Sequence, residues 1–102
     1  MSIVSLAEYR AMLREAPDAG LDSVLQSHLD DAEAEASQFV GFDIAAEYET
    51  DVPPPDLKAA VAFLAQTMSD QMPPDEVQVR KSRAESLLRP HRRETGIAEM
   101  AA

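Results

Sequence analysis

The sequence contains no cysteine and no tryptophan, and only five of its 102 residues are aromatic. The absence of cysteine excludes disulfides and thiolate metal sites, and with only His28 and His91 a histidine-based metal site would be poorly supplied. Because aromatic residues are so few, the core has to be built mainly from aliphatic side chains and alanine. This composition favours helices over a sheet.

Long apolar runs are also missing. No stretch approaches the roughly 18 consecutive apolar residues that a membrane-spanning helix needs. The opening residues MSIVSLAEYR lack the basic start and apolar run of a secretory signal. We therefore expect a protein that works in aqueous surroundings, with no membrane partner. A domain of this size is only marginally stable alone, so association between subunits would help it.

Positive charge is scarce and concentrated towards the C-terminus. Residues 1–76 carry sixteen acidic and three basic side chains, whereas residues 77–102 carry three acidic and six basic ones, and the net charge is −10. An acidic body argues against tight nucleic-acid binding, because affinity for phosphates comes mainly from Lys and Arg. Such a body suits a surface that DNA passes without sticking.

Helical spacing of apolar residues first appears near the N-terminus. Ser5 and Glu8 form a capping-box pattern, which predicts a first helix over residues 6–14. A second helix is predicted over residues 21–40, where one broad apolar stripe faces a polar side. Gly41 ends it, because glycine most easily adopts the left-handed conformation of a helix C-terminal cap.

The second half of the chain contains two further helical segments. Residues 42–54 lose the helical period and are predicted as a loop, and the triple proline that follows allows a third helix over residues 55–70. A fourth helix is predicted from residue 75 or 76 to residue 89. The fold class is therefore all-α: residues 1–89 form a small bundle of about four helices, and residues 90–102 form an extended C-terminal tail.

The third predicted helix contains the segment AAVAFLA, which is apolar almost all round. A helix of this kind is usually buried on several sides. One explanation is that it is the central helix of the subunit. The other is that its second face packs on a neighbouring subunit through Ala59, Ala62 and Phe63, and both explanations can hold together.

Residues suited to catalysis are absent or isolated. The sequence offers no Cys–His or Ser–His–Asp arrangement and no Gly-rich phosphate loop, so we predict no enzyme and no cofactor. The acidic pairs Asp30 with Asp31 and Glu33 with Glu35 indicate a solvated helix face, with divalent-cation ligands as the alternative. His28 lies beside an apolar stripe, which is typical of a partly buried packing residue.

A basic cluster surrounds His91, with Arg89, Arg92 and Arg93 close to it. It is either a solvated tail or a docking sequence for an acidic partner or for DNA.

Four segments together resemble one protein family, in the order in which they occur. These are IVSLAEYRAMLR, the long PDAGLDSVLQSHLDDAEAEASQFVGF, then PPPDLKAAVAFLAQTMSDQ, and finally ESLLRPHRRE. They resemble the head-tail connector (adaptor) family of long-tailed phages and gene transfer agents. Members of that family begin with a capped first helix and a long alanine-rich helix. A third helix then follows a proline loop, and a leucine pair with arginines comes last. One departure is at Thr67, Met68 and Ser69, where family members often have Tyr or Trp.

The resemblance implies a structural subunit that forms a ring of twelve copies beneath the portal, in the neck of the virion, after assembly in the host cytoplasm. The ring joins the portal to a tail-side connector or stopper protein, and genomic DNA passes through its channel without sequence-specific binding. Acidic side chains of residues 21–40 or 42–51 would face the channel or the tail. Our hypothesis for the residues that dock to the portal is Leu87, Leu88, Arg89, Arg92 and Arg93.

Two other functions compete with the connector. A small acidic helical adaptor or regulator inside the cell would bind one basic partner and stay a monomer or dimer. A small nucleic-acid-associated protein would use the basic C-terminal segment and show steep salt-dependent binding. An enzyme ranks last.

Replacing Arg92 and Arg93 together by Glu is expected to abolish attachment to the portal, because the docking segment would then repel an acidic partner. The double variant should keep its helical circular dichroism. Retention on immobilised portal protein measures attachment, and a variant that is retained like the native chain would remove the docking role.

Overall fold

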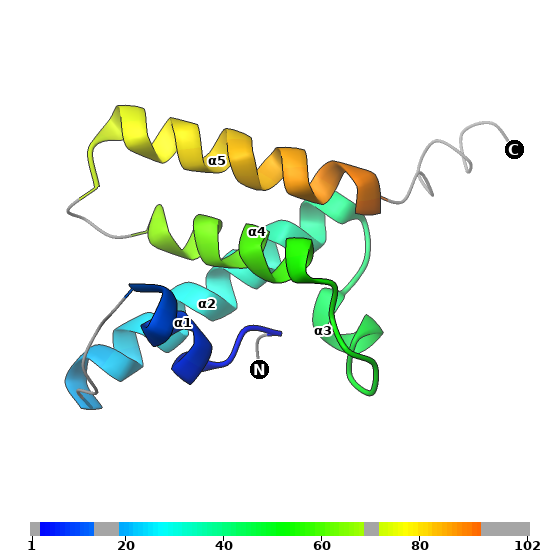
Figure 1. Cartoon of the computed structure of the whole chain (residues 1–102), viewed down its shortest axis with the longest axis horizontal. Coiled ribbons are helices and arrows are strands. Elements are labelled where there is room, and N and C mark those ends of the chain that lie inside the picture. Colours follow the sequence, from blue (N-terminus) through cyan, green and yellow to red (C-terminus); the bar gives the residue numbers. More distant parts are fainter. Residues whose placement is uncertain (1–2, 14–18, 69–71, 93–102) are drawn as a thin grey trace, which may run out of the picture.

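A computed structural model describes residues 3–13, 19–68 and 72–92. Within these ranges the chain is helical and contains no strand, which confirms the all-α prediction (Figure 1). The elements are, in chain order, α1 (Leu6–Leu13), α2 (Ala19–Val40), α3 (Ile44–Glu47), α4 (Pro55–Gln66), α5 (Pro74–Leu88) and the 3-10 turn η1 (Arg89–His91).

Helix α4 lies in the middle of the bundle, between α5 on one side and the α1–α2 pair on the other (Figure 1). Helices α4 and α5 run antiparallel. Arg80 Nε donates to Gln66 Oε1 at 2.8 Å, and the guanidinium of Arg83 lies 5.8 Å from the ring centre of Phe63. Short α3 follows the end of α2 and lies on the other side of α4 from α5.

The predicted signals for helix ends are confirmed at two places. Ser5 Oγ accepts from the Glu8 N–H at 3.1 Å, while Glu8 Oε1 accepts from the Ser5 N–H at 3.1 Å. This reciprocal pair is the capping box that opens α1. At the end of α2, Gly41 has a φ of 85°, a conformation that costs a residue with a Cβ atom about 1–2 kcal/mol.

Several predicted boundaries have to be corrected. Helix α2 begins at Ala19, two residues before the predicted start, and α4 ends at Gln66 instead of residue 70. After Gln66 the Thr67 hydroxyl donates to the Leu64 carbonyl at 2.6 Å and satisfies one of the last free acceptors of the helix. The predicted end of the first helix, at residue 14, lies outside the described residues.

The loop predicted over residues 42–54 contains a short helix, α3, so the prediction is wrong for Ile44–Glu47. Asp43 caps this helix, because its side chain accepts from the Ala46 N–H at 3.3 Å. The Ser37 hydroxyl accepts from the Ile44 N–H at 3.1 Å and ties α3 to α2. Four residues are too few to show a helical period, although the capping aspartate was visible in the sequence.

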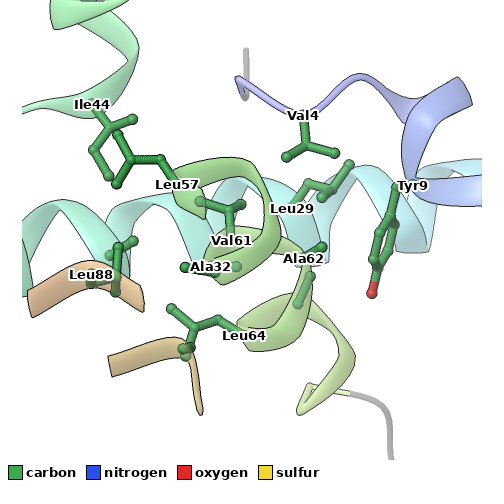
Figure 2. Packing of buried hydrophobic residues seen from close by; sticks show 14 of the residues in the cluster. Val4, Tyr9, Leu29, Ala32, Ile44, Leu57, Val61, Ala62, Leu64 and Leu88 are labelled. Atoms are coloured by element: carbon green, nitrogen blue, oxygen red, sulfur yellow. The ribbon is translucent and has the colours of Figure 1, made fainter. Parts of the chain in front are cut away.

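The core is aliphatic and alanine-rich, as the composition predicted. In Figure 2, Ala32 of α2 lies beside Val61 of α4, and Ile44 of α3 lies beside Leu57 of α4. Fully buried alanines let α2 and α4 approach closely, because a methyl group takes little space between helices. The buried residues are Val4, Tyr9, Leu25, Leu29, Ala32, Ala36, Val40, Ile44, Leu57, Ala60, Val61, Ala62, Leu64, Ala65, Ala84 and Leu88.

The buried residues confirm that α4 is the central helix. It contributes six of them from twelve positions, whereas α5 contributes only Ala84 and Leu88. Tyr9 is the one aromatic side chain in this set, and burial raises the pKa of its hydroxyl to about 12. A tyrosine in such surroundings stays neutral over the whole physiological range.

Both ends of the described chain are attached to the first turn of α4. Lys58 Nζ lies 2.5 Å from Glu8 Oε2 of α1, and Asp56 Oδ2 lies 2.7 Å from His91 Nε2 of η1. A separate bond holds the N-terminal segment, since Glu33 Oε2 of α2 accepts from the Ile3 N–H at 2.6 Å. These contacts join residues that are far apart in the sequence.

Replacing Leu29 by Ala is expected to lower the free energy of unfolding by about 2–5 kcal/mol, because Leu29 is fully buried between α2 and α4. Urea denaturation should show a lower midpoint with an unchanged slope. Val24→Ala, on the same helix with a side chain that is 48% exposed, is the matched control and should cost under about 1 kcal/mol. Equal losses in both variants would contradict the assigned core.

Candidate functional site

Two contacts hold the segment that follows α5 against the body of the bundle. His91 reaches Asp56 on α4, and the guanidinium of Arg92 lies 5.3 Å from the ring centre of Phe39 on α2. We call these four residues the C-terminal clamp. The sequence offered a solvated tail or a docking sequence for His91, and the structure instead gives its ring a partner within the subunit. Residues 93–102 of the predicted tail, including Arg93, lie outside the described residues.

The clamp also changes the titration of its carboxylate. The hydrogen bond to His91 holds the pKa of Asp56 below its ordinary value of 3.8. In the same way, the hydrogen bond from Lys58 lowers the pKa of Glu8. Both carboxylates are therefore better stabilised as anions in the folded chain than in the unfolded one.

The predicted portal-docking residues divide into two groups in the structure. Leu88 is 1% exposed and belongs to the core, so its assignment to a docking surface is wrong. Leu87 is half-buried and packs against the core. Arg89 and Arg92 are exposed, and they remain candidates for contact with a partner.

The predicted subunit-interface residues are similarly divided. Ala62 is only 3% exposed and faces the core, so its assignment to a surface contact is wrong. Ala59 and Phe63 are half-buried, four residues apart on the exposed side of α4. The antiparallel register sets Arg80 against Gln66 and Arg83 over Phe63, so the turn of α5 that carries Leu87 runs opposite the turn of α4 that carries Ala59.

These four side chains form a mainly apolar strip with one exposed cation. We call the strip of Ala59, Phe63, Arg83 and Leu87 the α4–α5 seam. Sequence reasoning identified three of its members but assigned them to two different functions. Arg83 was missed, because only the pairing of α4 with α5 places it over Phe63.

A second surface lies where α2 meets the turn into α3. An open hollow of about 520 Å³ is found there, and we call it the acidic hollow. Its apolar lining is Ala34, Phe42 and Ala45, and its polar lining is Asp30, Glu33, Ser37, Gln38 and Asp43.

Glu33 is the unexpected member of the hollow. Its side chain is 7% exposed, whereas Asp30, Asp31 and Glu35 are exposed as a solvated helix face should be. The prediction of a solvated face is therefore wrong for Glu33. Four residues separate it from Leu29, which is a core spacing on a helix, so the signal for its burial was present.

Other candidate residues have simpler surroundings. His28 is half-buried on α2. Among the described residues, no three His, Asp or Glu side chains converge so that they could hold a metal ion. None of the described helices combines the length and the apolar character needed to cross a membrane.

Comparison with known proteins adds no relative. No protein-family model matches the chain, and neither a curated protein nor a solved structure is significantly similar to it.

Replacing Asp56 by Asn is expected to flatten the acid side of the stability curve. The folded pKa of Asp56 is depressed, so its contribution is present above the ordinary pKa of 3.8 and is lost as the pH falls through the folded value. Urea unfolding at pH 5 and at pH 3 should show a smaller drop in the variant than in the native chain. Asp31→Asn, on the exposed side of α2, is the control, and equal drops in all three proteins would contradict the clamp.

Proposed function

We propose that the chain is a head-tail connector subunit of a tailed phage or gene transfer agent, assembling as a ring that joins the portal to the tail and lines the DNA channel. The proposal starts from the order of the sequence motifs. The structural observation that carries it is the separation of charge between two layers of the bundle. We propose the neck of the virion as the location of the protein, and the host cytoplasm as its location during assembly.

The charge separation follows the helices. Residues 19–52, which form α2, α3 and the turns beside them, contain nine acidic side chains and no Lys or Arg. Residues 74–92, which form α5, η1 and Arg92, contain five basic and three acidic side chains. Helix α4 lies between α5 and the first part of α2 (Figure 1), and the two groups meet at the C-terminal end of α2, where Arg92 lies over Phe39.

A subunit with different, complementary surfaces on two sides associates head to tail. Such heterologous contacts produce a closed ring when the rotation between neighbours closes, and a filament when it does not. A connector ring is of the first type. Twelve copies is the number that the family resemblance implies.

The acidic layer supports the channel role. Side chains without compensating Lys or Arg repel the phosphate backbone, so DNA in contact with this layer finds no strong binding site. We place the acidic side chains of α2 and α3 that lie outside the α2–α3 turn, such as Asp31, Glu35 and Glu47, towards the channel or the tail-side stopper protein. The exposed arginines Arg89 and Arg92 are then left for the portal.

Arg92 is a candidate for docking and also makes an internal contact, because it belongs to the C-terminal clamp. A cation over an aromatic ring contributes about 0.5–1 kcal/mol at an exposed site. Its replacement by Glu therefore removes one internal contact together with the charge. Arg89→Glu separates the two effects, since Arg89 is exposed at the end of the bundle outside the clamp.

Native mass spectrometry of the purified chain across a range of concentrations is the direct test of the connector. We expect a single ring-sized species, or stoichiometric capture of the chain by the portal protein of the same particle. A persistent monomer or dimer that ignores the portal would overturn the connector and support the adaptor. Retention on DNA that falls steeply with salt would support the nucleic-acid-associated protein instead.

A further inference from the structure

We infer that neighbouring copies of this chain contact one another by placing the α4–α5 seam of one copy in the acidic hollow of the next. This inference rests on the proposed ring and names the surfaces that would form it. The occupant of the hollow is thus a second copy of the chain.

The seam offers a cation mounted on an apolar strip. Arg83 is exposed and is positioned by the ring of Phe63, while Ala59, Phe63 and Leu87 are only half-covered by their own subunit. An arginine held in place over an aromatic ring loses less freedom on binding than a freely moving side chain. Aromatic and arginine side chains of this kind are enriched among the residues that dominate protein interfaces.

The hollow offers the complementary chemistry. Its apolar lining of Ala34, Phe42 and Ala45 matches the apolar part of the seam, and Asp30, Glu33 and Asp43 supply negative charge. Glu33 is 7% exposed; its carboxylate accepts from the Ile3 N–H at 2.6 Å, and no Lys or Arg of the described residues forms an ion pair with it. A carboxylate that is largely removed from water is stabilised by an opposite charge nearby.

The two surfaces cannot meet within one subunit. The hollow lies on α2 at Asp30, Ala34 and Gln38, which are exposed on the side opposite the stripe that packs on α4. The seam lies on α4 and α5, and α4 packs against the buried stripe of α2, so the body of α2 separates the seam from the hollow. Because the two surfaces differ, contact between them repeats in one direction, as a ring requires.

A nucleic acid or an anionic membrane fits the hollow poorly, because its polar lining is acidic. The seam alone has a single exposed arginine, too little charge for strong phosphate binding. The inferred contact leaves Arg89 and Arg92 free for the portal.

Exchange of charge between the two surfaces tests the contact. Arg83→Glu and Asp30→Arg, each in the full-length chain, place like charges across every interface. Each variant alone should require at least about 30-fold more protein for half-maximal assembly, as measured by native mass spectrometry. An equimolar mixture of the two should assemble again, because each copy then meets only the complementary neighbour. Its mass should show equal numbers of both variants.

Two matched variants control for non-specific charge effects. Glu35→Arg lies on the exposed side of α2 outside the hollow, and Lys81→Glu lies on α5 outside the seam. Neither should change assembly, and mixing them should have no effect. Circular dichroism confirms that each of the four chains is folded.

The outcomes separate the contact from the ring. If the single variants assemble like the native chain, or if their mixture fails to recover, the contact is overturned and the ring is kept. If the native chain stays monomeric at all concentrations and is not captured by the portal, the connector proposal is overturned, and the contact with it.

Discussion

The packing of α4 against α2 on one side and α5 on the other is the constraint on which the structure depends. A chain without tryptophan and with few aromatic residues cannot fill a wide core, so its helices must approach closely. Alanines on α2 and α4 allow this approach, with Ala32, Ala36, Ala60 and Ala65 all fully buried. Half of α4 is therefore inaccessible to water, and the remaining elements are arranged around it (Figure 2).

This central position of an apolar helix has an electrostatic consequence. Helix α4 carries only Asp56 and Lys58, both in its first turn and both paired with a distant part of the chain. Most other charges lie on the outer helices: α2 and α3 are acidic, α5 carries three basic and three acidic side chains, and Arg89 and Arg92 give the segment from α5 to residue 92 its positive excess. The separation of charge that supports the connector proposal thus follows from the way the core is built.

The same architecture explains why the surfaces cross element boundaries. The α4–α5 seam exists only because two antiparallel helices bring Phe63 and Arg83 together, and the acidic hollow exists only because α3 folds back beside α2. The C-terminal clamp is a third example, since it joins η1 to α4 and to α2. In each case a side chain acquires its surroundings from residues on another helix.

The sequence by itself determined the fold class, the capping box at Ser5 and Glu8, the end of α2 at Gly41 and the central place of α4. These features depend on local chemistry or on the helical period, which neighbouring residues encode. Only the tertiary structure decided that Leu88 and Ala62 are buried, that His91 pairs with Asp56, and that Arg83 covers Phe63. Each depends on how helices pack, and the bonds from His91 to Asp56 and from Ile3 to Glu33 join residues 35 and 30 positions apart, beyond the reach of any local pattern.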